Sequence, residues 1–197
     1  MINSENLQKI LPFGYLYLVT MGILKESVFY FQIDINILKY STIMDILISP
    51  IATLTANPVV LIGITVFILI CYAFVAFLSK NRSKKIIQKM SSLKNYDGLK
   101  EEDINKHYTN LLIAVIAMGT LSFFLGIGLG SGSSLSGKIK KDKLHYDQKL
   151  NFNTGETKEI YLIDNNSTYY FYIVKGNKNV QIAPIGAIKN IELIDTK

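Results

Sequence analysis

PVVLIGITVFILICYAFVAFL, residues 58–78, is a run of 21 residues without a charged side chain. At about 1.5 Å of rise per residue, a helix of this length covers roughly 30 Å, the thickness of the hydrocarbon core of a bilayer. Only a helix satisfies its own backbone hydrogen bonds there, and helices in soluble cores are rarely apolar on every face. Asn57 and Pro58 supply a capping side chain and a first-turn proline. The run therefore predicts a membrane-spanning helix at about 58–79.

A second secure span is predicted further along the chain. Residues 108–137 carry no charge over 30 positions, and Leu111–Leu129 form their apolar centre. A helix of this length crosses a bilayer, which predicts a span at about 108–130. The glycine- and serine-rich stretch 131–137 predicts a flexible exit from that span.

The first apolar run, residues 10–24, reaches only about 22 Å as a helix and is too short to cross alone. It becomes long enough if the helix continues past Lys25 and Glu26, which predicts a span at about 10–31. A lysine near a helix end extends to the headgroups, whereas a glutamate at that depth needs a partner, a proton or a wet pocket. Glu26 is therefore a candidate intramembrane functional residue, unless both charges simply lie at the membrane interface.

The segment 32–57 is apolar but interrupted by charges, so no span fits it. Thr42 and Asp45 have the spacing of a capping box, with aspartate in place of glutamate. This spacing predicts a short interfacial helix that begins at Thr42 and stops at Ser49 and Pro50.

The loop 80–107 carries eight basic residues, which favours the cytoplasmic side of a membrane. Ile86, Ile87, Met90 and Leu93 recur among them at helical spacing, which predicts a basic amphipathic helix on an anionic leaflet. The basic residues predicted to lie at the membrane surface are Lys80, Arg82, Lys84, Lys85 and Lys89.

Small residues recur every four positions in the third predicted span, at Ser122, Gly126, Gly130 and Ser134. This small-xxx-small pattern lets membrane helices approach closely. It predicts a tight helix contact through these four residues, either within the chain or between copies.

The last segment, residues 138–197, has a different composition, rich in β-branched and aromatic residues with turn residues between them. Turns are predicted at 164–167 and 175–179, and a change of spacing in 182–188 indicates one helical turn before the last strand. The predicted strands are Leu144–Phe152, Lys158–Ile163, Thr168–Val174, Val180–Ala183 and Ile188–Ile194.

Five short antiparallel strands with such a turn resemble an SH3-like or Sm-like barrel, a fold pattern that implies no particular function. The predicted fold class is thus an α+β integral membrane protein with three transmembrane helices, an interfacial connector and a small five-stranded β domain. The predicted domains are a helical membrane region, 1–137, and a β domain, 138–197.

The sequence contains few of the residue patterns that indicate a catalytic, metal or nucleic-acid site. The net charge of +6 comes from basic residues beside apolar runs, so the membrane is a simpler partner for them than nucleic acid. Two histidines and the single Cys71 make a poor metal site, and no motif indicates a catalytic residue, a cofactor or a small-molecule substrate.

Two functions follow as hypotheses. The first is a non-enzymatic membrane anchor or adaptor whose β domain binds a protein partner or assembles into a homo-oligomer. The alternative is an oligomeric pore-forming or membrane-perturbing effector of the kind used in bacterial conflict. Nine Lys and Arg residues on one side against seven on the other predict a cytoplasmic N-terminus and loop 80–107, with the β domain outside the cytoplasm of a bacterial inner membrane.

Overall fold

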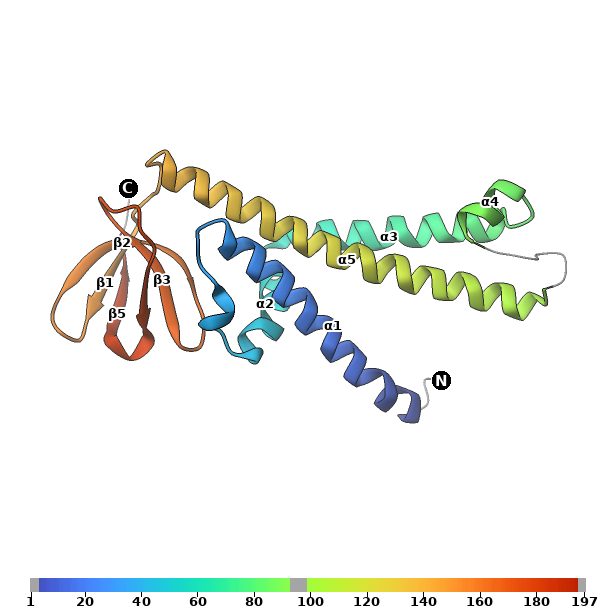
Figure 1. Ribbon diagram of the computed structural model, residues 1–197, viewed down its shortest axis with the longest axis horizontal. Coiled ribbons are helices and arrows are strands. Elements are labelled where there is room, and N and C mark those ends of the chain that lie inside the picture. The colour runs from blue at the N-terminus through green and yellow to red at the C-terminus, as the bar shows by residue number, and fades with distance from the viewer. Residues whose placement is uncertain (1–3, 93–98, 195–197) are drawn as a thin grey trace. The chain divides into compact units, whose positions relative to one another are not determined.

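The structure is a computed structural model that describes residues 4–92 and 99–194 of the 197-residue chain. In chain order, the long helices precede every strand (Figure 1). The elements are α1 (Ser4–Phe31), η1 (Ile37–Lys39), α2 (Ile43–Ala56), α3 (Pro58–Lys80), α4 (Lys85–Met90), α5 (Glu101–Lys140), β1 (Gln148–Phe152), β2 (Thr157–Asn165), β3 (Tyr169–Val174), β4 (Gln181–Pro184), η3 (Ile185–Ala187) and β5 (Ile188–Leu193).

The chain divides into two compact units, which are described separately below. One comprises residues 1–51 and 124–197, and the other comprises residues 52–123. The boundaries lie within α2 and α5, so each of these helices contributes to both units. These units are defined by contacts between residues, whereas the predicted domains, 1–137 and 138–197, are defined by composition. The predicted domain boundary therefore stays a prediction.

Two helices of the described residues, α3 and α5, are long and apolar enough to cross a membrane. α3 begins as predicted, because the Asn57 side chain accepts hydrogen bonds from the N–H groups of Val59 and Val60 at 3.1 and 3.4 Å. α1 covers the predicted range 10–31 and has sufficient length, but it is not among these two helices. The count of three spans therefore stays a prediction.

α5 is longer than its predicted span at both ends, and the flexible exit predicted at 131–137 is wrong. The helix continues through this stretch to Lys140. Gly132 lies against the backbone of α1, and Leu135 is buried in a cluster with Tyr30 and Phe171. Burial of one face of the stretch thus outweighs the weak helix propensity of its glycines and serines.

α2 begins at the predicted capping box but does not stop at Ser49 and Pro50, so the predicted end is wrong. Pro50 is inside the helix, which runs on to Ala56. A proline lacks an N–H group and leaves the carbonyl four residues earlier, that of Ile46, without its helical donor. Gly22 of α1 packs so closely on this carbonyl oxygen that a Cβ at Gly22 would collide with it. Pro50 is therefore accommodated in α2 at a point where α1 packs closely on the helix.

In the unit 52–123, α3 and α5 pack as an antiparallel pair. The ring of Phe67 on α3 covers Gly119 of α5 and stacks on Phe123 at 6.5 Å between ring centroids. At the opposite end of α3, Val75 and Leu78 join a buried cluster with residues near the start of α5. Late residues of one helix thus meet early residues of the other. The buried members of this cluster are Val75, Leu78, Ile87, Ile104 and Tyr108.

The strands form one curved antiparallel sheet in the order β4-β3-β2-β1-β5 (Figure 1). β1 to β4 pair in succession, and β5 returns to the free side of β1. The helical turn η3 lies between the last two strands as predicted. β4 and β5 are the two edges of an open sheet, so the SH3-like or Sm-like pattern is confirmed as a five-stranded antiparallel sheet but not as a closed barrel.

Both faces of this sheet are apolar, because β2 and β3 alternate between two clusters. One set of side chains, including Ile160 and Tyr172, is buried on one face of the sheet with Leu150 and Ala183. The other set, including Phe171, packs on the end of α1, the connector after it and the end of α5. The sheet is thus fixed to helical segments of its own unit. The buried residues of this second cluster are Tyr30, Ile33, Ile37, Leu135 and Phe171.

Candidate functional site

Glu26, the candidate intramembrane residue, lies in a buried polar cluster between α1 and α2. Its side chain is paired with the adjacent Lys25, whose Nζ lies 2.6 Å from Glu26 Oε1. The same Nζ donates to Ser49 Oγ at 2.9 Å, and Ser49 Oγ in turn donates to Glu26 Oε1. Glu26 is only 8 % exposed. The partner that a buried glutamate requires is therefore supplied within the chain.

The pair of Ser49 and Lys25 must also be considered as a candidate catalytic pair. A serine hydroxyl 2.9 Å from a lysine amine has the separation of a nucleophile and its general base. A lysine acting as a general base must be uncharged, whereas Lys25 forms an ion pair with Glu26. The cluster is thus better suited to joining α1 to α2 than to activating a nucleophile.

Asp164 of β2 connects the sheet to this part of α1. It accepts a hydrogen bond from the hydroxyl of Tyr30 at 3.3 Å, and Tyr30 is almost completely buried. The Asp164 residue as a whole is exposed, whereas its carboxyl group is hydrogen-bonded to the buried Tyr30 and lies within the electrostatic influence of Glu26. Burial, and next the negative charge of Glu26, raise the pKa of Asp164 above its ordinary value of 3.8.

A raised pKa gives Asp164 a predictable effect on stability. The folded state holds the proton of this carboxyl more tightly than the unfolded state, so its favourable contribution is complete below 3.8 and is lost as the pH rises through the folded pKa. Asp164→Asn, which cannot ionise, is expected to melt at the same temperature as the native protein at low pH and a few degrees higher at neutral pH. Thermal unfolding as a function of pH measures this difference, and a difference that does not depend on pH would contradict it.

The predicted capping box is confirmed, and it has a second role. Thr42 and Asp45 exchange backbone and side-chain hydrogen bonds of 2.8 and 3.2 Å. The Asp45 carboxylate also accepts from the N–H and hydroxyl of Ser167, at 3.1 and 3.0 Å, in the turn between β2 and β3. Beside it, the Asn166 amide donates to the carbonyl oxygen of Tyr40 at 2.9 Å. The turn of the sheet is thus hydrogen-bonded to the start of α2.

Asp45 responds to pH in the opposite direction from Asp164. Burial alone would raise its pKa, but the hydrogen bonds from Thr42 and Ser167 outweigh burial and hold the pKa of Asp45 below 3.8. The contribution of this carboxylate is therefore present above 3.8 and is lost as the pH falls through the folded pKa.

The closest packing of α5 on α1 does not use the four predicted small residues. A Cβ on Gly128 would collide with the carbonyl oxygen of Lys25, and one on Gly132 would lie 2.6 Å from that of Phe29. Gly126 and Gly130 have nothing within 4 Å of such a Cβ. Within the chain, the predicted face, Ser122, Gly126, Gly130 and Ser134, is exposed. Its use between copies stays a prediction.

The predicted basic residues divide into two kinds. Arg82 donates to the carboxylate of Glu101 at 2.8 Å and to the side-chain oxygen of Asn105 at 3.3 Å, which joins the end of α3 to the start of α5. The lysines at positions 80, 84, 85 and 89 are exposed. Ile87 of the predicted apolar stripe is buried, whereas Ile86 and Met90 are exposed, and Leu93 lies outside the described residues.

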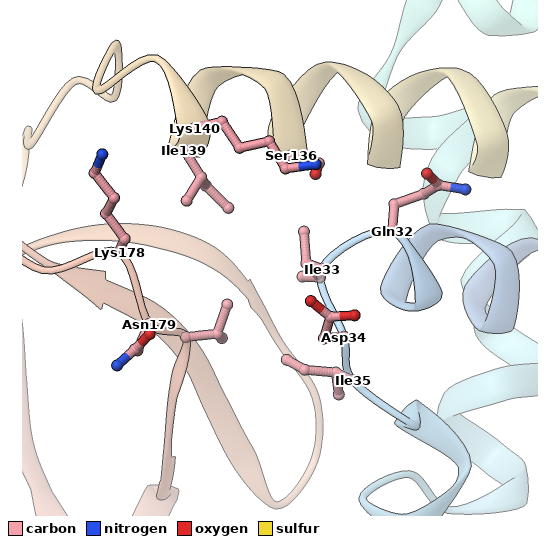
Figure 2. Close-up of a pocket in the computed structure, with 10 residues that line it drawn as sticks. Gln32, Ile33, Asp34, Ile35, Ser136, Ile139, Lys140, Lys178 and Asn179 are labelled. Atoms are coloured by element: carbon pink, nitrogen blue, oxygen red, sulfur yellow. The ribbon is translucent and has the colours of Figure 1, made fainter.

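A pocket of about 430 Å³ opens where α1 and α5 end beside the loop between β3 and β4. Figure 2 shows Ser136, Ile139 and Lys140 on the helix across the pocket from the segment that carries Asp34. Asp34 has a left-handed backbone conformation, φ 61°, which ends α1. The lining is mixed, with polar Gln32, Asp34, Ser136, Lys140, Lys178 and Asn179 beside apolar Ile33, Ile35, Ile139 and Val180.

Sequence reasoning identified Glu26 and the capping box but missed their partners. Ser49, Asp164 and Ser167 are distant in the chain from the residues that they contact, so no local spacing could have pointed to them. Gly128 and Gly132 did have a signal, since they are also four residues apart. Among the described residues, 4–92 and 99–194, no three His, Cys, Asp or Glu side chains are grouped as metal ligands would be.

Comparisons with known proteins provide no relative for this arrangement: no protein-family model, no curated protein and no solved structure matches the chain.

Proposed function

We propose that the protein is a non-enzymatic integral membrane protein that anchors its β domain on spanning helices and presents it to a protein partner or to another copy of itself. The observation that carries this proposal is the attachment of the sheet. Phe171 contacts the Tyr30 ring at 5.2 Å between ring centroids, and Ser167 and Asp164 are hydrogen-bonded to helical segments of the same unit. A sheet held in this way is a rigid platform rather than a tethered module.

The available part of this platform is a sheet edge. Side chains on both faces of β2 and β3 are buried in clusters, whereas β4 and β5 each have a neighbour on one side only. β4 has four residues and contains Pro184, which blunts an edge. β5 has six residues without proline, and Leu193 at its end is 81 % exposed. The β5 edge is therefore proposed to pair with an extended strand of the partner or of a second copy.

The backbone N–H group of Leu193 provides a test of this strand pairing. Successive N–H groups of a strand point to opposite sides. The N–H of Ile194 donates to the carbonyl oxygen of Asp147, the residue before β1, at 2.8 Å, so the N–H of Leu193 faces the free edge. A photo-crosslinking residue at the exposed Lys189 is expected to form a covalent adduct in native membranes. Leu193→Pro, which removes the outward donor, is expected to abolish most of that adduct.

Leu193→Ala is the matched control, because it removes the same side chain and keeps the N–H group. The control is expected to retain the adduct, and both variants are expected to retain the native melting temperature. An adduct that survives Leu193→Pro, or no adduct from Lys189 in the native protein, would contradict the role of β5.

The proposed topology has three crossings, with the N-terminus and loop 80–107 in the cytoplasm and the β domain outside it. Successive crossings alternate in direction, so the first and third helices must be parallel and the second antiparallel to the third. The contacts of Gly128 with Lys25 and of Gly132 with Phe29 advance in the same direction along α1 and α5. α3 and α5 pack antiparallel in their own unit. These directions support three crossings, and the basic loop supports the orientation.

The alternative function is an oligomeric pore or membrane-perturbing effector. The observation that favours it is the exposed small-residue face of α5, which would allow close packing between copies. Glu26, which would have lined an ion path, is instead bound by Lys25 and Ser49. Ion flux through the reconstituted protein, abolished by Gly126→Leu with Gly130→Leu, would favour this alternative over the adaptor.

A further inference from the structure

The turn after α3 and the short helix α4 have an outward surface that the adaptor function does not use. It consists of the exposed side chains of Ile86 and Met90, which are 75 % and 57 % exposed, and the exposed lysines around them. We infer that this surface, called here the Ile86 patch, inserts into an anionic lipid leaflet. The inference rests on the membrane crossing of α3 that the proposed function includes.

The patch is oriented by its attachment to the rest of its unit. Ile87 is buried against Val75 and Leu78 of α3 and against the start of α5. Ser91 donates to the carbonyl oxygen of Ile87 at 2.9 Å, and its own carbonyl oxygen lies 2.7 Å from the Nε2 of His107. The side of α4 that carries Ile87 is thus covered by α3 and α5. Helix geometry then gives the directions of its other side chains.

Residues of an α-helix are separated by roughly 100° around the axis. With Ile87 inward, Ile86 and its neighbour one turn later, Met90, lie on a flank, and Lys85 and Lys89 lie on the outward side next to them. Two apolar side chains beside cationic ones on one surface are the pattern of a segment that lies in a membrane interface. In water the same arrangement would leave both apolar side chains hydrated at a cost in free energy.

The patch is continuous with a surface suited to lipid. α3 ends at Lys80, and the large exposed side chains before its end include Phe74 and Phe77, which are 45 % and 58 % exposed. If α3 crosses the bilayer, Lys80 lies at the level of the headgroups, and the patch begins at the same level. The apolar surface of α3 and that of α4 then face one bilayer.

The positive charge of the Ile86 patch favours anionic lipids over neutral ones. The lysines at positions 80, 84, 85 and 89 are exposed and form no ion pair with any residue that the structure describes, in contrast to Arg82, which is bound to Glu101. Four cations with no acidic partner in the described part of the chain are complementary to the phosphate and carboxylate groups of anionic headgroups, to which basic juxtamembrane segments bind. Phosphatidylcholine, whose headgroup has no net charge, satisfies them poorly.

A fluorophore at position 86 tests the inference. Cys71, the single cysteine, is replaced by serine, and Ile86→Cys is labelled with an environment-sensitive dye in the full chain. The labelled protein is reconstituted into nanodiscs of phosphatidylcholine alone or mixed with phosphatidylserine. The expected result is a shift of the emission to shorter wavelength, with loss of quenching by aqueous iodide, in the phosphatidylserine discs only.

Two further variants make the result interpretable. Lys84→Gln with Lys85→Gln and Lys89→Gln is expected to abolish the shift at position 86. A dye at Ile113 of α5, 62 % exposed within the proposed third crossing, is expected to be protected from iodide in both lipids. A quenched dye at Ile113 would overturn the membrane crossing itself. A protected Ile113 with an identical signal at position 86 in the two lipids, or a shift that survives the lysine substitutions, would overturn the Ile86 patch alone.

Discussion

Replacing Lys25 with methionine is expected to destabilise the protein by about 3–5 kcal/mol, because it leaves the buried carboxylate of Glu26 without its cation. The side chains of Lys25 and Glu26 are only 15 % and 11 % exposed, and Nζ and Oε1 are 2.6 Å apart. Ser49 alone cannot replace the lost charge. Lys25→Met combined with Glu26→Gln removes both charges and is expected to recover most of the loss. Thermal unfolding in detergent at neutral pH, measured for these two variants and for Glu26→Gln alone, completes the double-mutant cycle.

The chain contains a matched control for this cycle. Lys175 and Glu159 form an ion pair of the same length, 2.6 Å, but their side chains are 63 % and 40 % exposed. Lys175→Met is expected to leave the melting temperature almost unchanged, because exposed ion pairs are screened by water. Equal losses from Lys25→Met and Lys175→Met, or additive effects at Lys25 and Glu26, would mean that burial does not strengthen the Lys25–Glu26 ion pair.

Gly128→Ala and Gly132→Ala are expected to destabilise the packing of α1 on α5, each by about 1–3 kcal/mol, as overpacking does in other closely packed interiors. The new methyl group at Gly128 would meet the carbonyl oxygen of Lys25, and that at Gly132 would meet the carbonyl oxygen of Phe29. A main-chain oxygen cannot rotate away as a side chain does, so the two helices must separate. The melting temperature in detergent is the measurement.

Gly126→Ala and Gly130→Ala provide the control on the same helix. Neither would bring a Cβ within 4 Å of another residue, and alanine favours a helix by roughly 1 kcal/mol over glycine. These two variants are expected to melt at or slightly above the native temperature. A loss of stability in the control pair equal to that in the first pair would contradict the assignment of the α1–α5 contact to Gly128 and Gly132.

The existence and type of most elements followed from the sequence alone. The charge-free run from Pro58 predicts α3 and its cap because capping depends on neighbours in the chain. The β-branched and aromatic residues of 168–174, bounded by turn residues on both sides, predict β3, because such side chains favour extended strands. The capping box at Thr42 and Asp45 and the helical turn η3 were predicted on the same local grounds. These features require only residues a few positions apart.

The errors concern segments whose conformation depends on distant neighbours. Pro50 was expected to end α2, and the stretch 131–137 was expected to leave the helix, since proline and glycine are poor helix formers. In the structure Gly22 packs on the carbonyl that Pro50 leaves without a donor, and Gly132 packs on α1. Local propensity amounts to about 1 kcal/mol per glycine, and close packing over several residues exceeds it.

By itself, the sequence determined most of the helical and extended segments, the helix starts at Asn57 and Thr42, and that Glu26 needs a partner. Only the tertiary structure decided which partner that is, which of two rows of small residues in α5 meets α1, and which carboxylates hold the sheet. The physical reason is that helix and strand periodicities arise within one segment, whereas Ser49, Asp164 and Gly128 gain their roles from side chains and carbonyls supplied by other segments. The periodicity of a helix or strand shows which residues share a face, and only the tertiary structure shows which other segment packs on that face.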